Sequence, residues 1–479
     1  MELIVLVPAL ACWAVLARGS IRQALLYVYL PAVLLLPNYF ILRFPHLPPL
    51  SFADMAILPL GVAMAATEMR RWRLDWMDLW VLLFAVSGAL SEGLSAELAN
   101  GEWVRLFAAG ATASHRLSTT VANGALKLFG CVTSILLPYM AGKLLIENGA
   151  VNGKPMREML VRRMVLFLAM VTALSVRDFL VGGSIWQTAF KPFFPGEAVE
   201  WPLQVRWGFG RITGPYAHAI LAGMMFLAGA VYCLWLLRVD RRWGTRRVFS
   251  GLPISQRWLT LGAILAGLLM TQSRGPWIGV ALAVVLVLLV RFLSVGRAAV
   301  VFVVLLAGLG AAGYGIGSRY TEGSRSQAAS EEQSSAIYRR ELLRSYMPIV
   351  LERKGFGWGF TDYPSSNGQK SIDNEFLWLA VTQGFVGLGL FLMIAVGSGA
   401  SLLLLASRPV RYEDRMLIFA HMAVLLGLLS TLTTVYMGEQ VVLLFFFIIG
   451  WVQGMNPAPA RAGSLAVAAP RFHFRRVLS

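Results

Sequence analysis

Three short polar clusters contain the side chains of this sequence that could do chemistry. The first surrounds Arg211 in a glycine-rich stretch, and the second is centred on Arg274, in a tight turn between two apolar stretches. A guanidinium group offers a planar fork of donors that fits a phosphate. The third cluster contains Asp373, which can accept a proton as a general base. Together these residue types indicate a site that binds an anion and removes a proton.

Each cluster also has a simpler structural interpretation. Arg211 could be anchored at the level of the lipid headgroups, and Arg274 could extend along the apolar surface into water. Asp373 could cap a helix, with Glu375 favoured in its first turn by the helix dipole. The sequence predicts all three clusters on the same side of a membrane, and this coincidence favours the functional interpretation.

The elements that must position these clusters are membrane helices. Of 479 residues, 57% are hydrophobic and only 14% are charged, and the apolar residues form blocks of the length that spans a bilayer. These properties exclude a single water-soluble globule and a disordered chain. We predict an all-α polytopic integral membrane protein with about 12–13 transmembrane helices. The predicted spans are 2–18, 21–42, 52–68, 76–93, 124–143, 160–182, 213–238, 257–273, 275–293, 297–317, 374–407, 415–436 and 438–454.

The distribution of basic residues sets the predicted orientation. The chain has 42 Lys and Arg against 25 Asp and Glu, and the basic residues crowd alternate short connections, which are then cytoplasmic. This distribution explains the net charge of +17 without a nucleic-acid partner. The opposite, periplasmic side then carries three long connections, at 94–123, 183–212 and 318–373.

We expect residues 1–454 to form one helical domain and residues 455–479 to form a disordered cytoplasmic tail. Within 318–373 the sequence predicts an amphipathic helix at 336–352, which we expect to act as a movable lid over the site. Its predicted apolar face consists of Leu343, Met347, Val350 and Leu351.

The sequence gives no signal for a metal, a cofactor or a disulfide. The three cysteines lie in apolar blocks without paired spacing, and the five histidines are scattered. Unlike most transporters, the chain does not obviously place ionisable residues inside its spans.

At these clusters the chain resembles the O-antigen ligase/polymerase superfamily of bacterial envelope polysaccharide assembly. The resemblance extends from about 205 to 405, and no single motif in it is specific. The ordered set consists of Arg211-x-x-Gly214, Ser273-Arg274-Gly275-x-Trp277, an arginine at Arg339 or Arg340, Gly355-x-Gly357-x-Gly359, Asp373-Asn374-x-x-Leu377 and Gly384-x-x-Gly387-Leu388.

The resemblance implies a metal-independent glycosyltransferase at the periplasmic face of the bacterial inner membrane. Its donor would be a saccharide on undecaprenyl diphosphate, and its acceptor a saccharide or a lipid-linked repeat unit. Arg211 and Arg274 would clamp the diphosphate, and Asp373 would activate the acceptor. Membrane lipids, and other envelope polysaccharide assembly proteins, are the remaining expected partners. The residues expected to contact substrate are Arg206, Tyr216, His218, Gln272, Ser273, Trp277, Arg339, Arg340, Asn374 and Glu375.

Asp373 is where this sequence departs from the ligases of the superfamily, which carry a histidine before the asparagine. The departure favours a polymerase of exopolysaccharide or O-antigen repeats. An O-antigen ligase that uses lipid A core, or a protein O-oligosaccharyltransferase, is the alternative. A transporter or flippase of lipid-linked sugars is a third hypothesis, and it predicts charged residues around a cavity at the membrane midplane.

Overall fold

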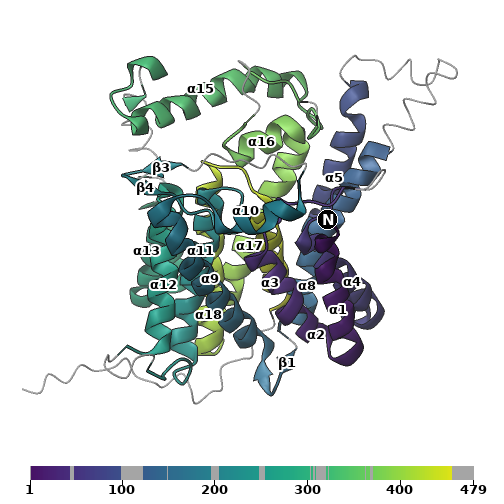
Figure 1. The fold of residues 1–479 in the computed structure, drawn as a ribbon, viewed down its shortest axis with the longest axis vertical. Helices are drawn as coiled ribbons and strands as arrows, with labels where there is room; N and C mark the ends of the chain where they lie inside the picture. Colours follow the sequence, from purple (N-terminus) through teal and green to yellow (C-terminus); the bar gives the residue numbers. More distant parts are fainter. Residues whose placement is uncertain are drawn as a thin grey trace, which may run out of the picture.

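The described part of the protein is a bundle of α-helices with two short β-hairpins (Figure 1). In a bilayer an α-helix satisfies its own backbone groups, which explains why apolar stretches of this length fold as helices. The computed structural model describes residues 2–43, 48–98, 122–147, 149–195, 204–247, 254–301, 304–305, 308, 320–321, 323–361, 363–366 and 371–455.

The N-terminal part of the bundle runs as far as α10. Ser51 and Asp54 form a capping box at the start of α4. The elements are η1 (Glu2–Leu6), α1 (Val7–Arg18), α2 (Ile21–Ala24), η2 (Leu25–Tyr29), α3 (Leu30–Leu35), α4 (Phe52–Thr67), η3 (Met69–Arg71), α5 (Trp76–Leu98), η4 (Val132–Leu136), α8 (Leu137–Leu145), β1 (Ala150–Val151), β2 (Lys154–Pro155), α9 (Met156–Val181), α10 (Ile185–Phe190) and η5 (Lys191–Phe193).

The C-terminal part contains the segments with the three polar clusters. Strands β3 and β4 are antiparallel, as are β1 and β2. The elements are β3 (Val205–Arg206), β4 (Phe209–Gly210), α11 (Ala219–Val239), α12 (Gln256–Met270), α13 (Arg274–Phe292), η6 (Arg325–Gln327), α15 (Glu331–Glu352), α16 (Glu375–Thr382), α17 (Gly384–Ser407), α18 (Tyr412–Leu432) and α19 (Glu439–Gly454).

Six described helices are long and apolar enough to cross a membrane, and five shorter helices are also apolar. The predicted all-α polytopic membrane fold is therefore confirmed. The number of spans stays a prediction, because most of 297–317 lies outside the described residues, as does the tail from 456 onwards. The six long helices are Trp76–Leu94, Ala122–Leu145, Met156–Val181, Ala219–Val239, Gly384–Ser407 and Tyr412–Leu432.

The described parts of the connections predicted to share one side of the membrane lie at one end of the bundle. Figure 1 shows β3, β4, α10, α15 and α16 at the upper end, and β1 at the lower end. We call the upper end the outer end and the lower end the inner end. The assignment of the outer end to the periplasm stays a prediction.

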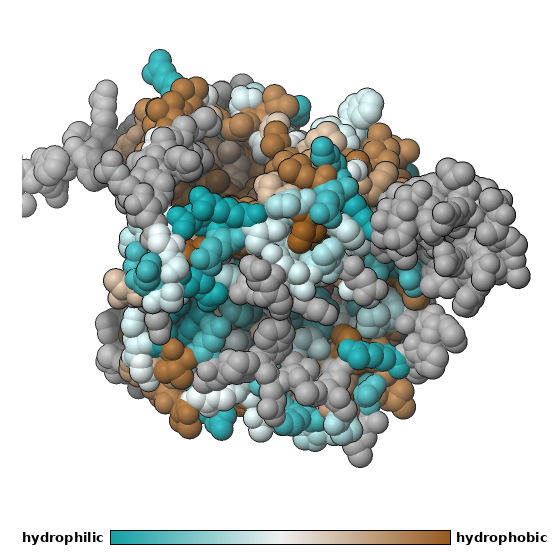
Figure 2. Space-filling view, turned by 90° about the horizontal axis from the view of Figure 1, so that it is seen from above, coloured by the Kyte–Doolittle hydropathy of each residue, from teal (hydrophilic) through white to brown (hydrophobic). Residues whose placement is uncertain are grey.

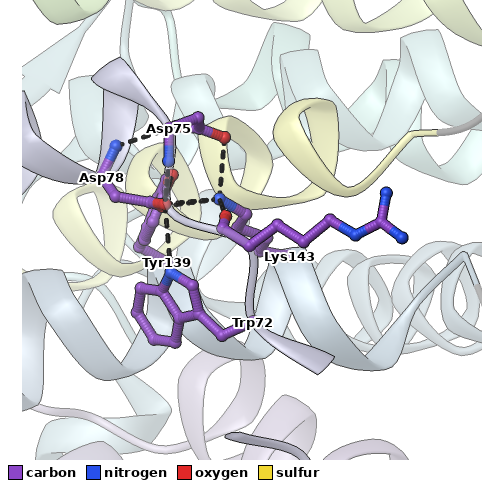
Figure 3. A network of polar contacts seen from close by, with 6 residues as sticks. Trp72, Asp75, Asp78, Tyr139 and Lys143 are labelled. Atoms are coloured by element: carbon purple, nitrogen blue, oxygen red, sulfur yellow. Dashed lines mark hydrogen bonds and ion pairs between the residues drawn. The ribbon is translucent and has the colours of Figure 1, made fainter. Parts of the chain in front are cut away.

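Charged residues at the inner end are paired with one another (Figure 3). Lys143 of α8 lies 2.8 Å from a carboxylate oxygen of Asp75 and 2.7 Å from one of Asp78. Tyr139 and Trp72 also donate hydrogen bonds to Asp78, at 2.6 and 3.0 Å. A buried charge is costly unless it is paired in this way. The network therefore fastens the start of α5 to the end of α8.

Helices α8 and α19 pack backbone against backbone. A Cβ atom at Gly142 would lie 2.1 Å from the carbonyl oxygen of Phe447, and one at Gly450 would lie 1.9 Å from that of Tyr139. Only glycine allows helices to approach so closely. This contact fixes α19, and with it the turn 433–438 that precedes α19, against the helix Ala122–Leu145.

The predicted span 374–407 is interrupted at Gln383, where α16 ends and α17 begins. The glycine segment 355–359 satisfies this break with its own backbone. Trp358 donates its backbone N–H to the carbonyl of Val381 at 2.8 Å, and the neighbouring Gly359 donates to the next carbonyl at 2.9 Å. The exit of α15 is thus hydrogen bonded to the break.

Helix α15 packs on the body through a different row of side chains from its predicted apolar face, and the contact of that face with the membrane boundary stays a prediction. Of that face only Val350 is buried, whereas Leu343, Met347 and Leu351 are 43%, 44% and 47% exposed. The helix period allows two neighbouring apolar rows in this sequence, so periodicity could not choose between them. The row that packs on the body consists of Leu342, Tyr346 and Val350.

Candidate active site

The β3–β4 hairpin brings two arginines to the outer end. Arg206 lies on β3, and Arg211 directly follows β4. The turn residues Trp207 and Gly208 both adopt positive φ, at 54° and 81°. Two such residues form the tight turn that matches the twist of paired strands, although this conformation is uncommon for tryptophan.

Both arginines bind the turn that joins α12 to α13. Arg211 donates from Nε to the Thr271 carbonyl at 3.1 Å and from Nη2 to Ser273 Oγ at 2.9 Å. Arg206 donates from Nη1 to the Gln272 carbonyl at 2.8 Å. Gln272 has a φ of 49°, and its buried Oε1 has no hydrogen-bond partner. The first two predicted clusters therefore form a single structure.

The arginines of the hairpin lack a carboxylate partner of the kind that Arg157 has at the inner end. Arg157 at the inner end lies 2.6 Å from Asp414, whereas Arg206 and Arg211 form no ion pair with any residue that the structure describes. Burial, and then the charge of Arg206, lowers the pKa of Arg211 to about 10, so Arg211 is still a cation at neutral pH. Buried cations without counter-charges favour an anionic ligand.

Arg339 of α15 adds to this positive cluster. Burial lowers the pKa of Arg339, the charge of Asp373 opposes that shift, and the charges of Arg206 and Arg274 add to it. The contacts agree with this, because Tyr338, next to Arg339, donates a hydrogen bond to the carbonyl of Ser371, and Arg211 binds Ser273, next to Arg274. The Nε of Arg339 is buried and has no hydrogen-bond partner. Arg340 instead donates to the carbonyl of Gly323, so we assign Arg339, of the two arginines predicted on this helix, to the cluster.

Asp373 lies beside the arginine cluster and is partly exposed. Ser371 Oγ donates a hydrogen bond to its Oδ1 at 3.1 Å. Burial and the charge of Asp373 raise the pKa values of Tyr338 and Tyr436, which approach it from α15 and from the turn 433–438. The carboxylate is thus bordered by one arginine and two phenols.

Asn374, and not Asp373, caps α16. Its Oδ1 accepts the backbone N–H of Leu377 at 3.0 Å, and its Nδ2 donates to the carbonyl of Thr433 at 3.1 Å. The alternative in which Asp373 caps the helix is therefore wrong. Asn374 joins α16 to the turn 433–438, and Asp373 is left available for another role.

Glu375 is enclosed behind that turn. Its carboxylate accepts the backbone N–H of Met437 at 2.5 Å. Burial raises its pKa to about 7, and the Met437 hydrogen bond and the charge of Lys127 oppose the shift. Glu375, which we predicted to contact substrate, therefore holds the turn 433–438 in place.

Three other predicted residues form internal contacts. Tyr216 is buried and donates to the carbonyl of Leu34 at 3.2 Å. Trp277 donates from Nε1 to the carbonyl of Leu268 at 3.0 Å, and Arg340 donates to the carbonyl of residue 323 at 3.0 Å. These contacts turn the polar ends of the three side chains toward the protein.

His218 begins α11 beside the arginine cluster. Its Nδ1 accepts the backbone N–H of Ile220 at 3.2 Å. Burial, and then the charge of Arg211, lowers the pKa of His218 to about 4, so the ring is neutral at physiological pH. A neutral ring adds no charge to the site and keeps one nitrogen for hydrogen bonding.

The outer face carries polar groups over its middle. Figure 2 shows hydrophilic residues spread across the middle of this face and hydrophobic residues gathered along its upper margin. Among the described residues, no three His, Cys, Asp or Glu side chains lie close enough together to hold a metal ion.

The sequence prediction missed Gln204 and Tyr436. Gln204 accepts hydrogen bonds from Arg211 through its carbonyl and its side chain, and Tyr436 approaches Asp373. No motif marks either residue. Only the hairpin and the turn 433–438 bring them to the site.

The fold and these contacts define a multi-pass helical membrane protein with an arginine-rich site beside a carboxylate at its outer end. Residues 259–392 match the model of the family described as O-Antigen ligase. The predicted resemblance to the O-antigen ligase/polymerase superfamily is thereby confirmed over a segment that includes Arg274, Arg339 and Asp373. The match supports a function of the ligase or polymerase type. No curated protein matches the chain.

Proposed function

We propose that the protein transfers a saccharide from undecaprenyl diphosphate to a sugar hydroxyl and thereby polymerises exopolysaccharide or O-antigen repeat units. The observation that carries this proposal is the pair Arg206 and Arg211, held on one turn without carboxylate partners. The match to the O-Antigen ligase family supports it independently, because Arg206 and Arg211 lie outside the matched residues.

The arginines would bind the diphosphate of the donor. As the glycosidic C–O bond breaks, its electron pair passes to a diphosphate oxygen, and negative charge on the leaving group increases. Guanidinium groups fixed in advance by Thr271 and Ser273 would stabilise that charge without reorganising. Arg274 and Arg339 would complete the clamp, because their charges act on the same region.

Asp373 would act as the general base. It accepts the proton of the acceptor hydroxyl while the oxygen forms its bond to the anomeric carbon. Its position supports this role, because it is partly exposed and receives a hydrogen bond from Ser371, while its neighbour Asn374 is the residue that caps α16.

Transfer to lipid A core, or to a protein, uses the same chemistry with another acceptor, and we keep the ligase as the second candidate because the matched family carries that description. A transporter is disfavoured, because β3, β4 and the start of α16, which carry or adjoin Arg206, Arg211 and Asp373, lie at the outer end of the bundle and not at its middle (Figure 1). We place this site at the periplasmic face of the bacterial inner membrane.

The test is incubation of the purified protein with a synthetic undecaprenyl-diphosphate repeat unit, followed by gel analysis. A polymerase gives a ladder of lengthening chains. A ligase gives no ladder but adds one glycan to purified lipid A core. Absence of both products in a preparation that remains monodisperse would contradict the proposed function.

A further inference from the structure

A second polar site lies at the outer end, in the N-terminal part of the bundle. It is a cavity of about 440 Å³ between the outer ends of α4, α5, the helix Ala122–Leu145 and α19. This volume falls within the range of small-molecule sites. The lining residues that matter here are Ser51, Asp54, Glu92, Lys127, Phe360 and Glu439.

Two charged groups in the cavity have no hydrogen-bond partner among the described residues. The Nζ of Lys127 lies over the aromatic ring of Phe360, 3.2 Å from the ring centroid. Glu439 begins α19 and lines the cavity, where its side chain is exposed. Ionisable groups within apolar helices mark binding or transport sites, because their cost requires a compensating role.

The other two acidic residues of the cavity, Glu92 and Asp54, are already bound and shape its wall. Glu92 accepts hydrogen bonds from the backbone of Phe360 and Thr361, which holds the Phe360 ring in place. Asp54 accepts the Ser51 N–H at 2.9 Å and its hydroxyl at 2.7 Å. Lys127 and Glu439 therefore remain as the groups that can bind a ligand.

This lining fits a neutral sugar. A sugar hydroxyl both donates and accepts, so neighbouring hydroxyls can satisfy an amine and a carboxyl group at once. The ring of Phe360 offers an apolar surface for the C–H face of a sugar. Asp54 and Glu439 oppose an anionic ligand, and Lys127 opposes a metal cation.

The cavity and the proposed base are separated by a single turn. Asn374, next to Asp373, donates a hydrogen bond to the carbonyl of Thr433 at one end of the turn 433–438, and Glu439 directly follows the other end. We infer that the cavity binds the terminal saccharide of the acceptor and directs one of its hydroxyls past Tyr436 toward Asp373. This inference names the acceptor subsite and rests on the proposed function.

The test measures saccharide binding directly, without turnover. Full-length protein in detergent is applied to a glycan array of neutral oligosaccharides, and the dissociation constant of the strongest binder is then measured. We expect Lys127→Met and Glu439→Gln each to weaken binding by about tenfold or more, the loss of one hydrogen bond to a charged group. The matched controls are Lys154→Met and Glu413→Gln, at exposed inner-end positions.

The outcomes separate the cavity from the proposed chemistry. Loss of binding in both cavity variants, with wild-type binding in the two controls, supports the subsite. Wild-type binding in the cavity variants, or no binder for the wild-type protein, overturns it. Binding that depends on Lys127 and Glu439 in a protein that transfers no saccharide would leave the subsite standing and remove the proposed function.

Discussion

Replacing Glu375 by glutamine should remove a pH dependence from the stability of the protein. The carboxylate accepts the N–H of Met437 behind the turn 433–438, and burial raises its pKa to about 7 from 4.5. The folded state therefore holds a proton that the unfolded state has lost at intermediate pH. Because the unfolded state binds fewer protons, stability falls as pH rises through this interval.

The magnitude follows from the difference between these two pKa values. Below about pH 4.5 both states are protonated, and Glu375 contributes no pH dependence. Between pH 4.5 and 7 each unit of pH costs up to about 1.4 kcal/mol, so above pH 7 the penalty reaches roughly 3 kcal/mol. Glutamine keeps the acceptor for Met437 and does not titrate, so the penalty should vanish.

The assay is unfolding in mixed micelles at pH 4.5 and at pH 8, for the wild type and for Glu375→Gln. The stability of the variant relative to the wild type should rise by roughly 3 kcal/mol between the two pH values. Any cost of burying the amide is independent of pH and cancels in this comparison. Glu352→Gln, at an exposed position of α15, is the matched control. Parallel pH curves for wild type and Glu375→Gln would refute the reasoning.

Three further predictions concern topology, catalysis and local stability. In intact cells an impermeant thiol reagent should label Ser330→Cys and not Thr245→Cys, because the native cysteines are buried; the reverse pattern would invert the assignment of sides. Asp373→Asn should lose most transfer at saturating acceptor and retain donor binding measured by filtration; unchanged specific activity would remove it as base. Glu92→Gln should lower stability by about 1–3 kcal/mol in thermal unfolding, since it weakens hydrogen bonds to the 360–361 backbone, and an unchanged midpoint would contradict this.

Hydropathy and charge sufficed to predict the helical membrane fold. They also sufficed to predict that the three polar clusters lie at the same end of the bundle. They could not show that 374–407 breaks at Gln383, because the segment is apolar throughout and the break is satisfied by the distant glycine segment 355–359. They also could not choose the buried row of α15, since two apolar rows compete.

Within the site, the residue types indicated where the two arginine clusters lie, but they did not predict the roles of the residues around them. Glu375 was expected to contact substrate, but it binds Met437, whose position depends on a turn far along the chain. Lys127 and Glu439 were not singled out, although ionisable residues in apolar stretches are the signal that could have found them. Sequence patterns could not predict that α19 packs against the helix Ala122–Leu145, and this packing is what brings Lys127 and Glu439 into one cavity.

The central claim is that Arg211 stabilises a diphosphate leaving group, and the initial rate of transfer from a synthetic undecaprenyl-diphosphate donor tests it most directly. The rate is measured at saturating donor for the wild type, Arg211→Ala and Arg211→Lys, each shown to be monodisperse. We predict that Arg211→Ala lowers the rate by about 10²–10³, and that Arg211→Lys recovers only a small part, because a point charge lacks the bidentate fork. A rate near that of the wild type in Arg211→Ala would contradict the claim.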